Sequence, residues 1–217
     1  MSRLPLPPCG FRWIRLGEKG VAALEFAIIM SFFLVVFIGS FQVLTLLRTS
    51  DKLNQLTGNL AQAVSEESPD GSAMSATTLR DLCYGAVKGL QPFGATGLVI
   101  NIASVTETTV GTTVEYWEQD FTGPSCTVSA SQAIGDTEAC GLATADHTGG
   151  MLPSSSGAIG DNAIIVQAQL TYPGLVGLWL TSSPTLTQTV LTRWAYASTS
   201  TKLTETGLTT SSIPCQS

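Results

Sequence analysis

The chain has 217 residues, of which 44% are hydrophobic and only 12% are charged, and its formal net charge is −6. The acidic balance argues against a nucleic-acid-binding function, which requires a basic surface. The charge is unevenly divided, because four Lys/Arg and one acid precede Val21, whereas six Lys/Arg and 14 Asp/Glu follow Leu47. The residues beyond Leu47 are numerous enough to bury one modest core.

The first predicted element is an apolar helix over Val21–Leu47, a run of 27 residues in which Glu25 is the only charged side chain. About 20 apolar residues cross a bilayer as a helix, whose backbone groups are all satisfied internally. The run is too long for the apolar region of a secretory signal, which has roughly 7–15 residues. Because a basic flank stays on the cytoplasmic side, we expect a single-pass protein whose acidic C-terminal part lies across the membrane.

A glycine and a glutamate mark the start of this helix, since Gly20 precedes the run and Glu25 follows five residues later. A charged, unpaired carboxylate near the start of a membrane helix is energetically costly. Cleavage between Gly20 and Val21 would create an α-amino group, with an unperturbed pKa of about 8, roughly one helical turn from Glu25. We therefore predict that residues 1–20 are a removable basic leader and that Glu25 pairs with the new amine, within one chain or between neighbouring subunits.

Small residues also recur at four-residue multiples along this helix, and such spacing lets helices approach closely in membranes. They are Ala23, Ala27, Ser31 and Gly39. The pattern favours specific helix–helix packing, with chance spacing as the alternative, because small residues are common in membrane helices.

The residues around Gly20 resemble the opening of the TadE/TadG-like minor pilins (pseudopilins) of the tight-adherence, type IVb pilus system. Members of this family have a short basic leader, a glycine, a Glu-Phe or Glu-Tyr pair five and six residues later, and then an apolar helix. Here these positions are Gly20, Glu25 and Phe26. The family's usual proline after the methionine is replaced by Ser31, which leaves the processing signal intact.

The resemblance covers residues 15–50 well and residues 160–197 loosely, where a strand ending in Tyr172-Pro173 is similar to one in the family. It implies that a prepilin peptidase of the aspartic type removes the leader and that the mature chain joins, primes or caps a Tad pilus. The implied partners are that peptidase, other pilins of the filament, the inner-membrane assembly platform and membrane lipid. The implied location is the bacterial inner membrane, with the C-terminal domain in the periplasm and, after assembly, in the extracellular pilus.

Two helical segments are predicted beyond the membrane. The first helix is expected to continue as an amphipathic extension over residues 48–67, with apolar residues at helical spacing, and to end at the breaker 68–71. The extension's stripe is Leu53, Leu56, Leu60 and Val64. A second helix is predicted over residues 75–90, capped by Ser75 or Thr77. Its single apolar stripe is Leu79, Leu82, Cys83, Ala86, Val87 and Leu90.

Four strands are predicted from alternation and β-branched content. They are residues 97–106, 112–118, 163–171 and 186–197. We expect an antiparallel sheet packed against the second helix and the amphipathic extension, an α+β fold over residues 68–197. Residues 121–160, rich in small and polar side chains, are predicted to be an insertion, and residues 198–217 a Ser/Thr-rich tail.

Four cysteines lie beyond the membrane run, while Cys9 falls in the leader. They are Cys83, Cys126, Cys140 and Cys215. An even number in an oxidising compartment predicts two disulfides, and four cysteines allow three pairings. The favoured pairing joins Cys126 to Cys140 across a short loop and Cys83 to Cys215, with free buried thiols as the alternative.

Catalytic motifs are missing from the sequence, which has no G-x-S-x-G, P-loop, dinucleotide fingerprint or H-E-x-x-H. No enzyme activity, cofactor or metal is therefore predicted, and His147 is interpreted as a solvated loop residue. Three acids are interpreted as the exposed face and edge of a strand, rather than as paired carboxylates or calcium ligands: Glu115, Glu118 and Asp120. Three tryptophans are predicted to lie in the core or an interface: Trp117, Trp179 and Trp194.

Three hypotheses follow from the sequence. The leading one is a structural protein, a minor pilin that is processed and assembled through its N-terminal helix. The runner-up is a permanently anchored envelope protein whose outer domain binds a partner or a surface. A membrane-tethered enzyme is the third, and it lacks a catalytic constellation in this sequence.

Overall fold

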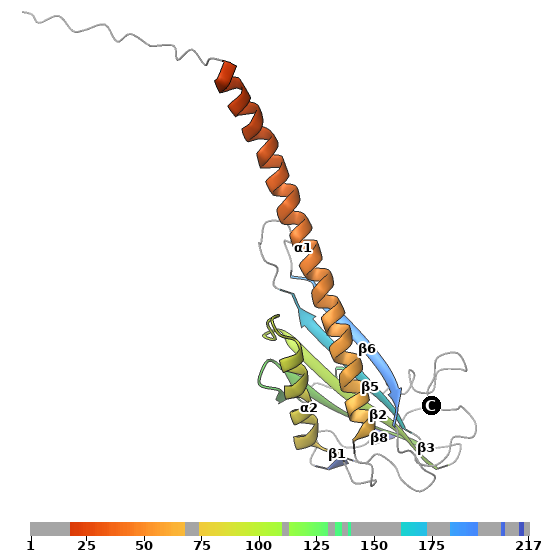
Figure 1. Ribbon diagram of the computed structural model, residues 1–217. Helices are drawn as coiled ribbons and strands as arrows, with labels where there is room; N and C mark the ends of the chain where they lie inside the picture. Colours follow the sequence, from red (N-terminus) through yellow and green to blue (C-terminus); the bar gives the residue numbers. More distant parts are fainter. Residues whose placement is uncertain are drawn as a thin grey trace, which may run out of the picture. The chain divides into compact units, whose positions relative to one another are not determined.

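The structure is a computed structural model, and the residues that it describes are 18–67, 74–109, 113–129, 133–135, 139, 162–172, 183–194, 205–206 and 213–214. The chain divides into two compact units, Met1–Val43 and Leu44–Ser217. Within the described residues the elements are two α-helices and a predominantly antiparallel set of strands, which confirms the α+β class expected from the sequence (Figure 1).

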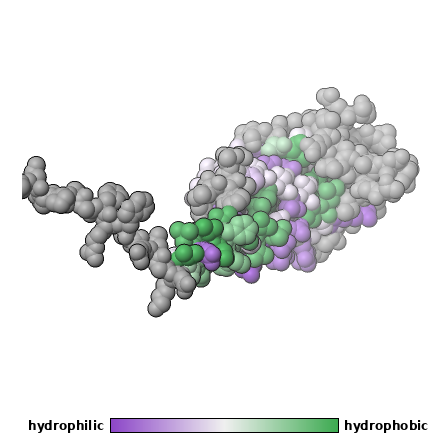
Figure 2. Space-filling view, turned by 90° about the horizontal axis from the view of Figure 1, so that it is seen from above, coloured by the Kyte–Doolittle hydropathy of each residue, from purple (hydrophilic) through white to green (hydrophobic). Residues whose placement is uncertain are grey.

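The long helix α1 runs without a break from Glu18 to Glu66, 49 residues (Figure 1). In the first unit its large apolar side chains are exposed all round, as Phe26 at 66% and Phe37 at 70% illustrate. Figure 2 shows the hydrophobic residues of this part of α1 gathered in one green cluster. One helix of the described chain is therefore long and apolar enough to cross a membrane, and exposure of that kind suits side chains that face lipid rather than water.

In the second unit α1 is amphipathic, with its apolar side chains on one side of the helix only. The predicted stripe of Leu53, Leu56, Leu60 and Val64 is buried, and each of these side chains is at most 6% exposed. Thr57 is buried on the same side, and its hydroxyl donates to the Leu53 carbonyl oxygen at 2.7 Å. A buried hydroxyl that is satisfied by its own helix costs little, so the stripe tolerates it.

The second helix, α2, spans Ala76–Gly89 and begins at the cap that the sequence allowed at Ser75. The Ser75 hydroxyl accepts a hydrogen bond from the Thr78 amide at 3.0 Å, which satisfies one of the orphan donors of the first turn. Leu79 and Cys83 of α2 are buried, as the predicted stripe requires.

The main sheet is antiparallel, with the strand order β4-β3-β2-β5-β6 and the short β8 paired to β3. Its strands are β2 Leu98–Thr109, β3 Thr113–Thr122, β4 Thr127–Ser129, β5 Asn162–Thr171, β6 Thr185–Arg193 and β8 Ile213–Pro214. Two short strands, β1 Met74–Ser75 and β7 Glu205–Thr206, pair in parallel in a separate sheet. The four predicted strands are β2, β3, β5 and β6. The sheet continues to Ser129, so it includes the first residues of the segment predicted as an insertion.

Both helices cover one face of this sheet and share one hydrophobic core with it (Figure 1). The inner face of β2 is the one predicted from its alternation, since Leu98, Ile100 and Ile102 are all buried. Cross-strand partners continue the core on each side, where Ile100 faces Phe121 of β3 and Ala168 of β5. Two of the predicted core tryptophans, Trp117 and Trp194, are also buried members of this core, at 3% and 2% exposure, which confirms the prediction for them.

A disulfide joins α2 to the turn that follows β3, and it links Cys83 to Cys126. A disulfide was predicted, but the favoured pairing of Cys126 with Cys140 and of Cys83 with Cys215 is wrong. The apolar stripe of α2 carries Cys83 onto the end of β3, and both paired sulfurs belong to buried residues. Packing of a helix on a strand therefore decided the pairing, and loop length did not. Cys140 and Cys215 lie outside the described residues.

We predict that peptide mapping without reduction recovers Cys83 linked to Cys126. The bridge closes a separation of 43 residues, and the chain-entropy model assigns such a loop about 4 kcal/mol. The double substitution Cys83→Ser and Cys126→Ser should lower the free energy of unfolding of the detergent-solubilised chain by that amount in a urea titration. Cys9→Ser is the control and should change nothing. Recovery of a peptide that links Cys126 to Cys140 would contradict the structure.

Candidate functional site

The predicted processing pair, Gly20 and Val21, lies in the first turn of α1, which begins at Glu18. The first four backbone N–H groups of a helix have no partner within it, so the peptide bond between these two residues belongs to the turn that opens most readily. Val21 is 52% exposed.

Glu25 lies one turn further along α1, and its side chain is exposed among exposed apolar neighbours such as Leu24 and Phe26. The carboxylate makes no hydrogen bond or ion pair within the described part of the chain. Residues four apart on a helix face the same side, so Val21 and Glu25 share one face. The apolar part of the helix, Val21–Val43, thus carries a single acid, four residues after the position where leader removal would leave an amine.

The small residues singled out in the sequence are all open on the helix surface. Ala23, Ala27 and Ser31 are exposed, and a Cβ placed on Gly39 would meet nothing within 4 Å. The Ser31 hydroxyl donates to the Ala27 carbonyl oxygen at 2.8 Å, so it needs no outside partner. A second helix could approach this strip closely without leaving a hydroxyl unsatisfied in lipid.

Two side chains from the strands hold the outer half of α1. The Tyr172 hydroxyl, after β5, donates to Thr45 Oγ1 at 3.0 Å. The Trp194 indole N–H, after β6, donates to the Glu67 carbonyl oxygen just past the end of α1, also at 3.0 Å. These two bonds lie at opposite ends of the amphipathic extension. The Tyr-Pro sequence at Tyr172 was noticed only through the family resemblance, and no local pattern indicates that its hydroxyl binds the helix.

The acids of β3 differ from the sequence prediction. Glu118 and Asp120 are only 1% exposed, not the exposed face of a strand. They alternate with core residues of β3, so they lie on the sheet face opposite the helices. There Glu118 accepts hydrogen bonds from the Ile134 amide at 2.8 Å and the Gly135 amide at 3.1 Å, and Asp120 accepts one from the Ala133 amide at 3.2 Å.

The prediction of exposed acids failed because it assumed that this face of β3 is open to solvent. The strand is covered on this face by residues 133–135, whose backbone amides the two carboxylates satisfy. Ile134 is itself buried, at 5% exposure. Glu115 lies in β3, but its side chain is outside the described part of the structure. Trp179 and His147 lie outside the described residues altogether. The buried acids therefore fasten part of the predicted insertion to the sheet, and no catalytic role follows from their geometry.

Potential metal ligands do not gather in the described part of the chain, where no group of three or more His, Cys, Asp or Glu residues lies together. Comparison of the chain with protein-family models, curated proteins and solved structures finds no match.

We predict that Glu118→Gln lowers the free energy of unfolding by about 2 kcal/mol, because one buried amide of residues 133–135 would then face an NH2 group instead of an acceptor. Urea titration of the solubilised chain measures this change. Asp51→Asn, the same substitution at an exposed position on α1, should stay within about 0.5 kcal/mol of the parent. Equal stability of the Glu118→Gln variant and the parent would show that these amides do not depend on the carboxylate.

Proposed function

We propose that the chain is a minor pilin or pseudopilin of a Tad-type (type IVb) pilus, processed by a prepilin peptidase and assembled through α1. One observation carries the proposal: Glu25 is the only charged residue on the exposed apolar surface between Val21 and Val43, and it lies five residues after Gly20. An unpaired carboxylate in that position is costly in lipid. A helix that serves only as a membrane anchor does not require a carboxylate in that position.

Removal of the leader explains why the acid is tolerated. The new amine on Val21 would be mostly cationic at neutral pH and would lie on the same helix face as Glu25. The same pair can form between neighbouring subunits that are offset by one helical turn, where a low dielectric strengthens it. The helix N-terminus also favours a negative side chain. Processing would thus turn an anchor with a costly acid into a subunit whose acid binds an amine.

The proposed location is the bacterial inner membrane, with the N-terminus in the cytoplasm and the outer domain in the periplasm. The basic flank before Val21 supports this orientation, and the Cys83–Cys126 disulfide supports an oxidising compartment. The partners would be the peptidase, other pilins of the filament, the assembly platform and membrane lipid. The role would be structural, in pilus biogenesis and surface adherence, with no enzyme activity and no cofactor.

We predict that the chain extracted from membranes begins at Val21, as measured by intact mass or N-terminal sequencing. Gly20→Leu should leave the precursor uncut, because a bulky side chain at the scissile position would be excluded from the peptidase. Gly39→Leu is the matched control, since it places leucine at another open glycine of the same helix, and processing should proceed. An unprocessed parent chain in cells with normal pili would favour the permanently anchored envelope protein instead.

We also predict that Glu25→Val inserts into the membrane at least as well as the parent but enters sheared pili at least about tenfold less, a loss of more than about 1.4 kcal/mol of assembly free energy. Immunoblots of the membrane and sheared fractions measure both quantities. Ser40→Val, a polar-to-valine change at an exposed position of the same helix, should assemble normally. Normal incorporation of the Glu25→Val chain would refute the pairing of acid and amine.

A further inference from the structure

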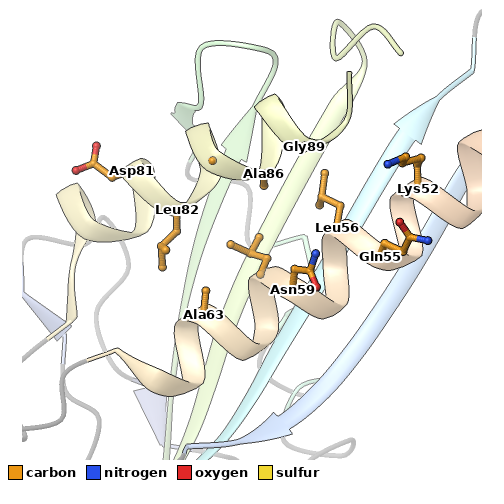
Figure 3. Close-up of a pocket in the computed structure, with 11 residues that line it drawn as sticks. Lys52, Gln55, Leu56, Asn59, Ala63, Asp81, Leu82, Ala86 and Gly89 are labelled. Carbon is orange, nitrogen blue, oxygen red and sulfur yellow. The ribbon is translucent and has the colours of Figure 1, made fainter. Parts of the chain in front are cut away.

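A groove of about 440 Å3 lies between α1 and α2 on the helical side of the outer domain, and Leu56 and Leu82 point between the two helices (Figure 3). Its charged lining residues are one cation and one acid, Lys52 and Asp81. They give the groove no net charge, so its charge selects no class of occupant. The edge of the sheet at β6 is more specific, because the backbone groups of an open strand edge match those of another extended chain.

β6 is the last strand of the main sheet, and no described strand pairs with its outer edge. Its other edge pairs with β5 at nine consecutive positions, from Thr185 opposite Thr171 to Arg193 opposite Ala163. In an antiparallel ladder the N–H and C=O groups of every second residue point away from the partner strand. The outer edge therefore presents the backbone groups of about four residues, over a length of about 30 Å.

The other side of the sheet is covered by short strands of the same chain. There β3 pairs with β4 at residues 120–122 and with β8 at Glu115 and Tyr116, so five of its ten residues have a partner on that side. β7, which lies in the same C-terminal tail as β8, pairs with β1. The described strands of the tail are therefore all paired away from β6.

The sequence of β6 lacks the features that usually keep an edge strand from pairing with another chain. Lysine, proline, inward-pointing charges and bulges are the common ones. β6 has no lysine, proline, glycine or acid, its ladder with β5 has no register shift, and its one charged residue is Arg193 at the last position. Its remaining residues are threonine, leucine, valine and glutamine. The edge is thus long, regular and uncharged over eight residues.

Two apolar side chains on the helical face of β6 are incompletely covered. Leu186 and Val190 pack against the hydrophobic core but remain half-buried. Their cross-strand partners on β5, Leu170 and Val166, are at most 2% exposed. The threonines that alternate with them lie on the opposite face and are exposed. A further strand beside β6 would complete the cover of the two apolar side chains.

We propose that the outer edge of β6 binds an extended segment of another protein, which adds a strand to the main sheet. The segment would pair with the outward backbone groups of β6 and place apolar side chains at alternate positions, beside Leu186 and Val190. Its intervening side chains would be polar, beside the exposed threonines. In strand addition the backbone supplies affinity and the alternate side chains supply specificity. The proposal concerns residues 185–193 and does not depend on cleavage at Gly20.

A second copy of the chain fits this edge less well. β6 runs in the same direction as α1, because it starts near Tyr172, which bonds to Thr45, and ends at Trp194, which bonds to Glu67 (Figure 1). Antiparallel pairing of two β6 strands would therefore turn the two α1 helices in opposite directions, which two chains anchored in one membrane cannot adopt. Parallel pairing would turn one sheet over and place threonines beside Leu186.

Two synthetic peptides test the pattern on the detergent-solubilised full chain. Both have about 11 residues, enough to span the edge, with polar ends and the same composition. One alternates valine and threonine, and its isomer has the valines in one block. Fluorescence anisotropy should show saturable binding of the alternating peptide, at least about tenfold tighter than that of the isomer. Equal affinities, or no saturation by about 1 mM peptide, would overturn the proposal.

A set of alternating peptides, each with one N-methylated residue, tests for backbone pairing. Because only every second N–H of an added strand faces its neighbour, methylation should weaken binding at least about tenfold at every second position. The positions between them should stay within about threefold of the parent peptide. A uniform effect, or none, would show that the peptide does not bind as a strand and would overturn the proposal.

Variants of the chain test whether the peptide lies at β6. Val190→Thr removes an apolar contact beside the edge and should weaken the alternating peptide about fivefold. Leu191→Thr is the matched control, because this next residue of β6 is also half-buried but lies on the opposite face, and it should bind as the parent does. Thermal melts of both variants check that they fold. Equal binding by the two variants would overturn the proposal.

A photo-crosslinking residue at Thr187, which is exposed on β6, identifies the occupant in cells. Mass spectrometry of the adduct should map the crosslink to a segment of a different protein in which apolar residues alternate with polar ones. A synthetic copy of that segment should displace the alternating peptide from the solubilised chain. No adduct, an adduct within the chain or an adduct with a second copy would overturn the proposal.

Discussion

A single helix with two kinds of side-chain pattern constrains everything else in this chain. The backbone of α1 forms its own hydrogen bonds from Glu18 to Glu66. These bonds are kept whether the helix is surrounded by lipid, water or protein. Only the side chains must change. They are apolar all round through the membrane-length part and form one buried stripe through Leu53, Leu56 and Leu60. The outer domain is built on that stripe, because a half-polar helix needs a sheet to cover its apolar side.

The outer domain is fastened by contacts that lie far apart in the sequence. The Cys83–Cys126 disulfide ties α2 to the end of β3, while Tyr172 and Trp194 bind the two ends of the amphipathic extension of α1. On the opposite face, Glu118 accepts hydrogen bonds from the Ile134 and Gly135 amides, and Asp120 accepts one from the Ala133 amide. A polar group buried with its partners rigidifies a domain. Any pull or displacement of the outer part of α1 would therefore reach the sheet through specific bonds.

The two features that carry the functional proposals have a common physical character, since each presents groups whose bonds a partner would complete. Glu25 is a charge on an otherwise apolar helix surface, and β6 has an outer edge that no described strand covers. Residues that disfavour the stability of their own element are expected mainly at functional sites, and an unprotected strand edge invites pairing with another chain. The proposal for Glu25 concerns assembly in the membrane, and it rests on a part of the chain separate from β6 and from the groove between α1 and α2.

The sequence by itself determined the helices, the four long strands and the membrane-length apolar run, because their signals are local: spacing of 3.6 or 2 residues, caps, and a continuous run of apolar residues. Only the tertiary structure decided the disulfide partner of Cys83, the burial of Glu118 and Asp120, the added strand β4 and the groove between α1 and α2. Each of these depends on segments distant in the chain that meet after packing. A periodic pattern records which side of an element is apolar, but it carries no information about which other element will cover that side.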